Sequence, residues 1–147
     1  MNEDMTRQMI DLPEWPHAFG VPGNSGLIRS CPEDFVVEEV SRIQPDGEGS
    51  HLWLWVEKRS ANTDWVAREL AKVAACPQRD VGYAGLKDRH AVTRQWFSVP
   101  VGENIAARVA AADIPDVSIL ASSNHGRKLK RGTLDGNRFR LQIRQLQ

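Results

Sequence analysis

The sequence predicts one α+β domain with a mixed, largely antiparallel sheet and helices on one face. Three observations carry this prediction: short segments rich in β-branched and aromatic residues, segments of helical periodicity between them, and turn residues that separate the two kinds. The chain has 147 residues, which is enough for a single domain with its own core.

The N-terminal third predicts a lead-in followed by two strands. Proline and glycine recur through residues 1–25, which therefore read as extended chain without regular structure, ahead of a domain over residues 26–147. Residues 27–30 are consistent with a short strand, and the β-branched run at 35–40 predicts a longer one. Residues 45–49 then form a turn.

The middle of the chain predicts a covered strand and a helix. Residues 51–58 are apolar at the centre of both alternating faces, so this strand is expected to be covered on both sides. Asn62 or Thr63 can cap a helix that runs through about Ala75, where apolar residues recur at helical spacing and Pro77 ends the pattern.

The last third predicts two more strands, a short helix and a hairpin. Residues 95–101 and 117–121 read as strands, and the alanine-rich residues 105–112 read as a short helix. Segments 128–133 and 138–144 flank an Asp-Gly pair, which is a strong hairpin-turn signal, so we expect a hairpin there.

Composition excludes several classes of protein. No apolar run is long enough for a membrane span or follows the charged N-terminus as in a signal peptide. The two cysteines, Cys31 and Cys76, are far apart and lack metal-binding spacing, so neither a disulfide scaffold nor a metal site is expected, and a reducing cytoplasm fits.

Charge is distributed unevenly along a chain of zero net charge. Residues 1–50 hold ten acidic and three basic side chains, whereas residues 125–147 hold seven basic and one acidic. A basic end can bind an anionic partner, and it can equally be the solvated face of a strand pair. The candidates for phosphate contact are Arg127, Lys128, Lys130 and Arg131.

The densest polar group is Lys87-Asp88-Arg89-His90, between a glycine-containing approach and a strand. Flanking cations keep an aspartate ionised, which suits a nucleophile or general base. The competing interpretation is a surface turn in which Asp88 bonds its own backbone, and spacing alone favours it. His90 has no visible catalytic partner.

Three further residues have two possible roles. Phe35 and Phe139 are ordinary strand aromatics by default, but an aromatic ring can also stack on a flipped base. Asn137 lies where a turn is expected to end, and asparagine is favoured in turns for backbone reasons. Its side-chain amide could also pair with a uracil edge.

Taken together, these segments resemble the tRNA pseudouridine synthase D (TruD) family. The segment from Gly82 to Val99, GYAGLKDRHAVTRQWFSV, looks like the family's signature. Four other segments match in the family's order: CPEDFVVEEV, PDGEGSHLWLWVEK, NTDWVARELAK and RKLKRGTLDGNRFRLQIR. The resemblance covers roughly residues 26–144.

The resemblance implies a chemistry and a site. The family isomerises uridine to pseudouridine in tRNA, at position 13 in bacteria, with no cofactor and no metal. Its catalytic aspartate matches Asp88, which attacks the base, attacks the sugar or removes a sugar proton; the sequence does not choose among these routes. Lys87 belongs to the same motif. The substrate-contacting residues match Phe35, Asn137 and Phe139, and a basic partner of the carboxylate, often lysine, falls at Arg29.

The resemblance also sets alternatives. Family members continue well beyond the position of Gln147, so the chain is expected to be a partial catalytic domain with an incomplete cleft, and an unpaired sheet edge would invite self-association. The alternatives to an enzyme are a noncatalytic tRNA-binding module and, more weakly, a structural or subunit-contact domain.

Overall fold

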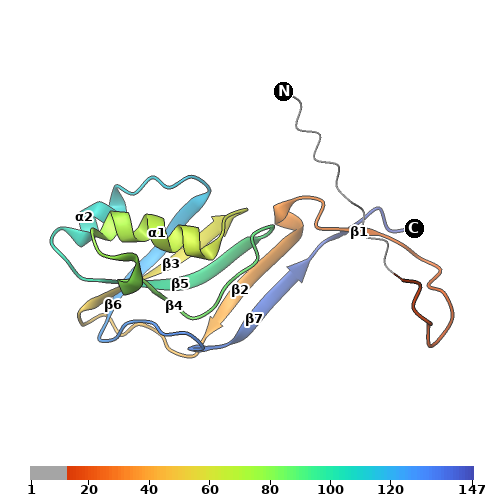
Figure 1. The fold of residues 1–147 in the computed structure, drawn as a ribbon, viewed down its shortest axis with the longest axis horizontal. Helices are drawn as coiled ribbons and strands as arrows, with labels where there is room; N and C mark the ends of the chain where they lie inside the picture. Colours follow the sequence, from red (N-terminus) through yellow and green to blue (C-terminus); the bar gives the residue numbers. More distant parts are fainter. Residues whose placement is uncertain (1–12) are drawn as a thin grey trace, which may run out of the picture.

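A computed structural model describes residues 13–147 (Figure 1). The strands are β1 (Leu27–Ile28), β2 (Phe35–Ser41), β3 (His51–Arg59), β4 (Gly82–Tyr83), β5 (Val92–Pro100), β6 (Val117–His125), β7 (Leu134–Leu141) and β8 (Ile143–Arg144); the helices are α1 (Thr63–Ala74) and α2 (Ile105–Ala110). Residues 13–26 form no helix or strand, and the rest of the expected lead-in lies outside the described residues.

One mixed sheet organises the chain. Its strands lie in the order β6-β3-β5-β2-β7. Strand β2 pairs with the first residues of β5, and β4 pairs with later residues of β5. Only β2 and β5 are parallel, so the sheet is largely antiparallel, as predicted. The short strands β1 and β8 form a separate ribbon that extends away from the sheet (Figure 1).

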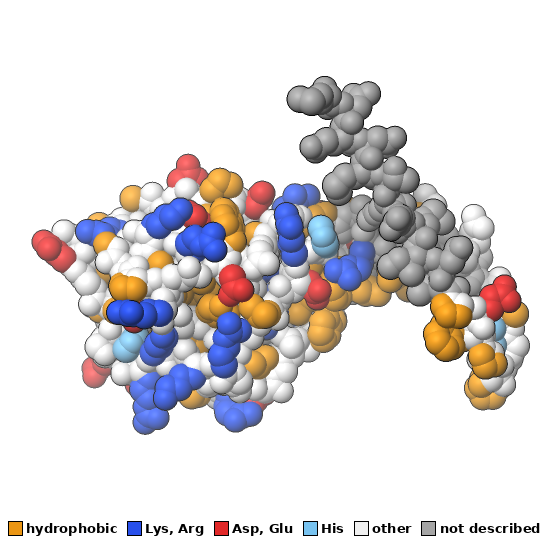
Figure 2. Space-filling model, in the orientation of Figure 1, with side chains coloured by type: hydrophobic (Ala, Val, Ile, Leu, Met, Phe, Trp, Pro, Cys, Tyr) orange, Lys and Arg blue, Asp and Glu red, His pale blue; other side chains and the backbone are white. Residues whose placement is uncertain are grey.

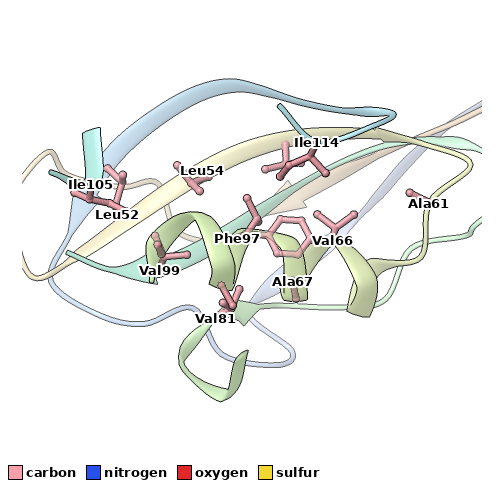
Figure 3. Packing of buried hydrophobic residues seen from close by; sticks show 14 residues of the cluster. Leu52, Leu54, Ala61, Val66, Ala67, Val81, Phe97, Val99, Ile105 and Ile114 are labelled. Carbon is pink, nitrogen blue, oxygen red and sulfur yellow. The ribbon is translucent and has the colours of Figure 1, made fainter. Parts of the chain in front are cut away.

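Both helices cover one face of the sheet, which confirms the predicted α+β class. Val66 and Leu70 of α1 are fully buried in one cluster with Leu54 and Phe97 of the central strands. Figure 3 shows Val66, Leu54 and Phe97 in this cluster. Burying one such side chain favours folding by about 1.5–3 kcal/mol. Asn62 caps α1 by accepting a hydrogen bond from the amide of Asp64. Neither helix is long and apolar enough to cross a membrane.

The segment between β6 and β7 lies across the opposite face. Leu129 packs there on Trp53 and is 2% exposed, and the indole of Trp53 donates to the carbonyl of Arg127 at 2.9 Å. A side chain at Gly82 would meet the carbonyl of Leu129 at 2.3 Å, so this close approach requires glycine. Strand β3 is therefore covered on both sides, as its sequence predicts.

The predicted C-terminal hairpin is wrong. Residues 128–133 are irregular, and the Asp135-Gly136 pair lies inside β7 rather than in a turn. Val40 pairs with Gly136 and Ser41 with Leu134, so Asp135 is the extra residue of a β-bulge. The partner of β7 is β2, almost 100 residues earlier in the chain. The Asp-Gly pair therefore forms part of a bulge and not of a hairpin turn.

Candidate active site

Asp88 lies in the irregular loop between β4 and β5. Its side chain is 51% exposed. In residues 13–147 its carboxylate accepts no hydrogen bond from its own backbone, and its one close cation is Arg29, whose Nη2 lies 3.8 Å from Oδ1. The turn interpretation of Asp88 requires that local hydrogen bond, so its main structural support is missing.

Buried polar side chains hold this loop from beneath. Gln95 donates to the carbonyl of Gly85 at 2.9 Å, and the amide of Lys87 donates to the hydroxyl of Thr63 at 3.1 Å. The ammonium of Lys58 donates to the carbonyl of Asp88, also at 2.9 Å. A loop outside the sheet ladder needs such partners for its backbone. These contacts fix the path of the chain on both sides of Asp88.

Lys87 points into the protein rather than toward solvent. Its Nζ lies 3.2 Å from Oε2 of Glu39, and the two side chains are 4% and 0% exposed. Burial raises the pKa of Glu39, and the charge of Lys87 opposes that rise. Because breaking such a buried pair leaves an uncompensated charge, the pair anchors the loop to β2.

Three predicted residues form a chain of contacts that begins at Asp88. The guanidinium of Arg29 lies 4.7 Å from the ring centroid of Phe35, and the rings of Phe35 and Phe139 stack at 5.9 Å with an interplanar angle of 11°. Phe139 is 60% exposed, so it is not a core residue. An arginine, a carboxylate and two aromatic rings thus share one accessible surface. We call these four residues the Asp88 cluster.

Asn137 belongs to the same side of the sheet. It lies within β7, in register with Glu39, and two residues before Phe139, so both point to the helix-covered face. The turn interpretation of Asn137 is therefore wrong. Its side chain is exposed. The strand alternation places an amide next to the aromatic pair.

The basic residues lie apart from this cluster, beside β4. Lys128, Lys130 and Arg131, together with Arg79 and Tyr83, line an open depression of about 600 Å³. Arg131 stacks over the ring of Tyr83 at 4.0 Å and donates to its hydroxyl at 2.9 Å. Lys and Arg side chains gather at the lower edge of Figure 2, over the connection from β6 to β7. Arg127 is exposed at the start of the same segment.

The sequence analysis missed four residues that support the loop. Lys58, Thr63 and Gln95 lie in elements whose pattern predicts only packing, and Glu39 reads as an ordinary strand carboxylate. The one available signal is that Lys58 continues the inward alternation of Leu52, Leu54 and Val56. In the described part of the chain, no cluster of three or more His, Cys, Asp or Glu residues could hold a metal ion.

Comparison with known proteins points to one family. The family model "tRNA pseudouridine synthase D (TruD)" matches residues 16–147. A protein of that name from Chromohalobacter salexigens is 50% identical over 141 residues, covering 95% of this chain and 40% of the relative. One from Hydrogenovibrio crunogenus is 42% identical over 137 residues, covering 93% and 40%.

A solved structure shows a similar fold. The crystal structure of a Methanosarcina mazei protein, a candidate TruD, superposes with a TM-score of 0.72 at 28% identity, covering 81% of this chain and 27% of that one. The chain thus spans about 40% of the length of the curated relatives it matches.

Proposed function

The chain belongs to the tRNA pseudouridine synthase D family, and on that premise we propose that residues 26–147 are the part of a tRNA pseudouridine synthase that carries its catalytic carboxylate, Asp88. The substrate is uridine in tRNA, at position 13. The reaction is an isomerisation, so no group is gained or lost overall.

The observation that carries the proposal is the Asp88 cluster itself. Its four members come from separate segments, yet Asp88 lies 3.8 Å from Arg29, Arg29 lies 4.7 Å from the ring of Phe35, and that ring lies 5.9 Å from the ring of Phe139. Core packing does not explain an exposed carboxylate that is linked through Arg29 to two partly exposed rings. A site for a flipped nucleotide does, because it needs a reactive group and an aromatic platform side by side.

Each residue has a role in the reaction. The bond from the ribose to N1 of uracil breaks, the uracil turns and a bond forms to its C5; C5 then loses its hydrogen as a proton and N1 takes up a proton, so the formula is unchanged. Asp88 supplies the ionised carboxylate, and Arg29 keeps a positive charge beside it. The ring of Phe139 stacks on the base, Phe35 supports that ring, and the amide of Asn137 pairs with the uracil edge.

The basic segment binds the rest of the substrate. Arg127, Lys128, Lys130 and Arg131 contact tRNA phosphates, which fix the orientation of the RNA without reading its sequence. Their separation from Asp88 suits a large substrate, because the phosphates of a folded RNA lie far from any single flipped base.

The test uses an extended protein, in which these 147 residues are joined to the part of the C. salexigens relative that the match leaves out. It is incubated with tRNA labelled with tritium at C5 of uridine. We expect tritium release from a tRNA with uridine at position 13 and none when cytidine replaces that uridine. Tritium release from both tRNAs would contradict the assignment of position 13 as the modified uridine. Tight tRNA binding without any release would favour the noncatalytic module instead.

A further inference from the structure

Lys58 is buried although it carries a charge. It is 1% exposed, on the helix-covered face of β3, opposite Thr93 of β5 and Val117 of β6. Lysine is almost never fully buried unless it is paired. Within residues 13–147, no carboxylate lies within ion-pair distance of its ammonium, and the acceptor it reaches is the backbone carbonyl of Asp88, at 2.9 Å.

The surroundings make this an expensive place for a lysine. An unpaired buried ammonium is costly, and a leucine between Thr93 and Val117 would be more favourable for folding. The hydroxyl of Thr93 beside it is also buried without a hydrogen-bond partner. Packing therefore gives no reason for Lys58, whereas the carbonyl of Asp88 does.

The charge of Lys58 is coupled to the same loop. Burial lowers its pKa to about 8, the negative charge of Asp88 acts against that fall, and the positive charge of Lys87 adds to it. Lys87 is itself paired with Glu39. The side chains of Thr63 and Gln95, which also support the loop, are uncharged. Of the charged groups, Asp88 alone favours the protonated form of Lys58.

We propose that Lys58 is a positioning residue for Asp88. It fixes the backbone of Asp88 from inside the protein, while Arg29 approaches the carboxylate from the accessible side. The inference rests on the proposed function, because holding Asp88 in place matters for activity only if Asp88 is the catalytic residue. It adds a residue to the site that touches neither substrate nor reacting atoms and acts only through Asp88.

The first experiment replaces Lys58 by methionine in the extended protein. Methionine has a similar volume and an unbranched stem, but it offers no donor and no charge. We expect kcat to fall at least about tenfold, with KM and the Kd for tRNA unchanged within about twofold. Thr93→Val is the matched control: it removes a neighbouring buried hydroxyl that makes no hydrogen bond, and its kcat should stay at the wild-type value.

Two results would overturn the inference. One is a Lys58→Met protein that melts like the wild type and keeps its kcat. The other is a loss that appears entirely in KM or in tRNA binding, because a positioning residue for Asp88 affects the chemical step. A wild-type extended protein that releases no tritium is a different result: it removes the proposed function, and this inference with it.

A second measurement keeps the inference testable if the methionine variant does not fold. The pH dependence of kcat is compared for the wild type and for Lys58→Arg, whose side chain stays charged. We expect the wild-type kcat to fall as the pH rises through about 8 and the arginine variant to lack that step. Superimposable profiles would contradict the role of Lys58, since any titration of the uracil is common to both proteins.

Discussion

The guanidinium of Arg29 lies 3.8 Å from the carboxylate of Asp88 although the two residues are 59 positions apart in the chain. The backbone of Arg29 is in the left-handed region, with φ at 56°, which a residue with a side chain seldom adopts. The same guanidinium donates to the carbonyl of His90 at 3.4 Å and covers Phe35. Arg29, which directly follows β1, thus contacts both the loop that holds Asp88 and the ring of Phe35.

Arg29→Met should lower kcat/KM roughly five- to thirtyfold. The variant loses an exposed ion pair and an exposed cation–π contact, each worth up to about 1 kcal/mol. Arg29→Lys keeps the charge but loses the planar stacking, so its loss should be smaller. The measurement is steady-state tritium release by the extended protein. Equal losses in the two variants would contradict a role for the charge.

Phe139→Ala should reduce modification more than it reduces tRNA binding. Stacking on one base contributes about 1–3 kcal/mol, so the rate should fall roughly five- to a hundredfold. Phe139→Tyr keeps the ring and should be tolerated. Thermal melting is the control, because the ring is 60% exposed and its removal should change stability little. A large fall in the melting temperature would mean instead that Phe139 supports the fold.

Neutralising the basic segment should flatten the salt dependence of tRNA binding. Arg127→Gln with Lys130→Gln should reduce the slope of log K against log salt by roughly one for each lost phosphate contact. Arg68→Gln with Arg108→Gln is the matched control, because it removes the same charge from the exposed surfaces of α1 and α2. If both pairs change the slope equally, the segment has no special role.

The buried carboxylate of Asp34 should make stability depend on acid. Arg144 donates to both of its oxygens, at 2.7 and 2.8 Å, and these hydrogen bonds lower the pKa of Asp34 to about 2 from the ordinary 3.8. Because the pKa is lower in the folded state, the ionised carboxylate stabilises the fold fully at pH values above its unfolded-state pKa. That stabilisation is lost as the pH falls through about 2.

Asp34→Asn should therefore be less stable than the wild type at pH 7, and the difference should shrink below about pH 4. Denaturant unfolding of the extended protein at several pH values measures it. Glu33 and Asp46 also have lowered pKa values. Both residues are present in the wild type and in the variant, so their effect on stability cancels in the difference between the two proteins. An unchanged difference between the two proteins from pH 7 to pH 3 would contradict the account of this pair.

The sequence predicted the elements that local periodicity determines. Strands β2, β3 and β5 and helix α1 have clear alternation, helical spacing or capping residues, and their positions agree with prediction to within a few residues. The hairpin failed because an Asp-Gly pair suits both a turn and a bulge, and the choice depends on pairing with β2, which lies far away in the chain. Local sequence contains no information on that partner.

The site divides in the same way. Asp88, Phe35 and Phe139 were predicted because their segments match a family motif, and in the structure Arg29 links the carboxylate to the two stacked rings. Lys58 was not predicted, because a lysine near a strand end reads as a solvated side chain. Its burial appears only when the loop of Asp88 folds over it. Buried polar contacts of this kind depend on tertiary structure alone.

The most direct test of the account is tritium release by the Asp88→Asn variant of the extended protein. Asparagine keeps the size of the side chain and removes its charge and its basic oxygen. We predict unchanged melting and tRNA binding, with a loss of at least about a thousandfold in the rate of release. Release at a rate within tenfold of the wild type would show that Asp88 is not the catalytic residue.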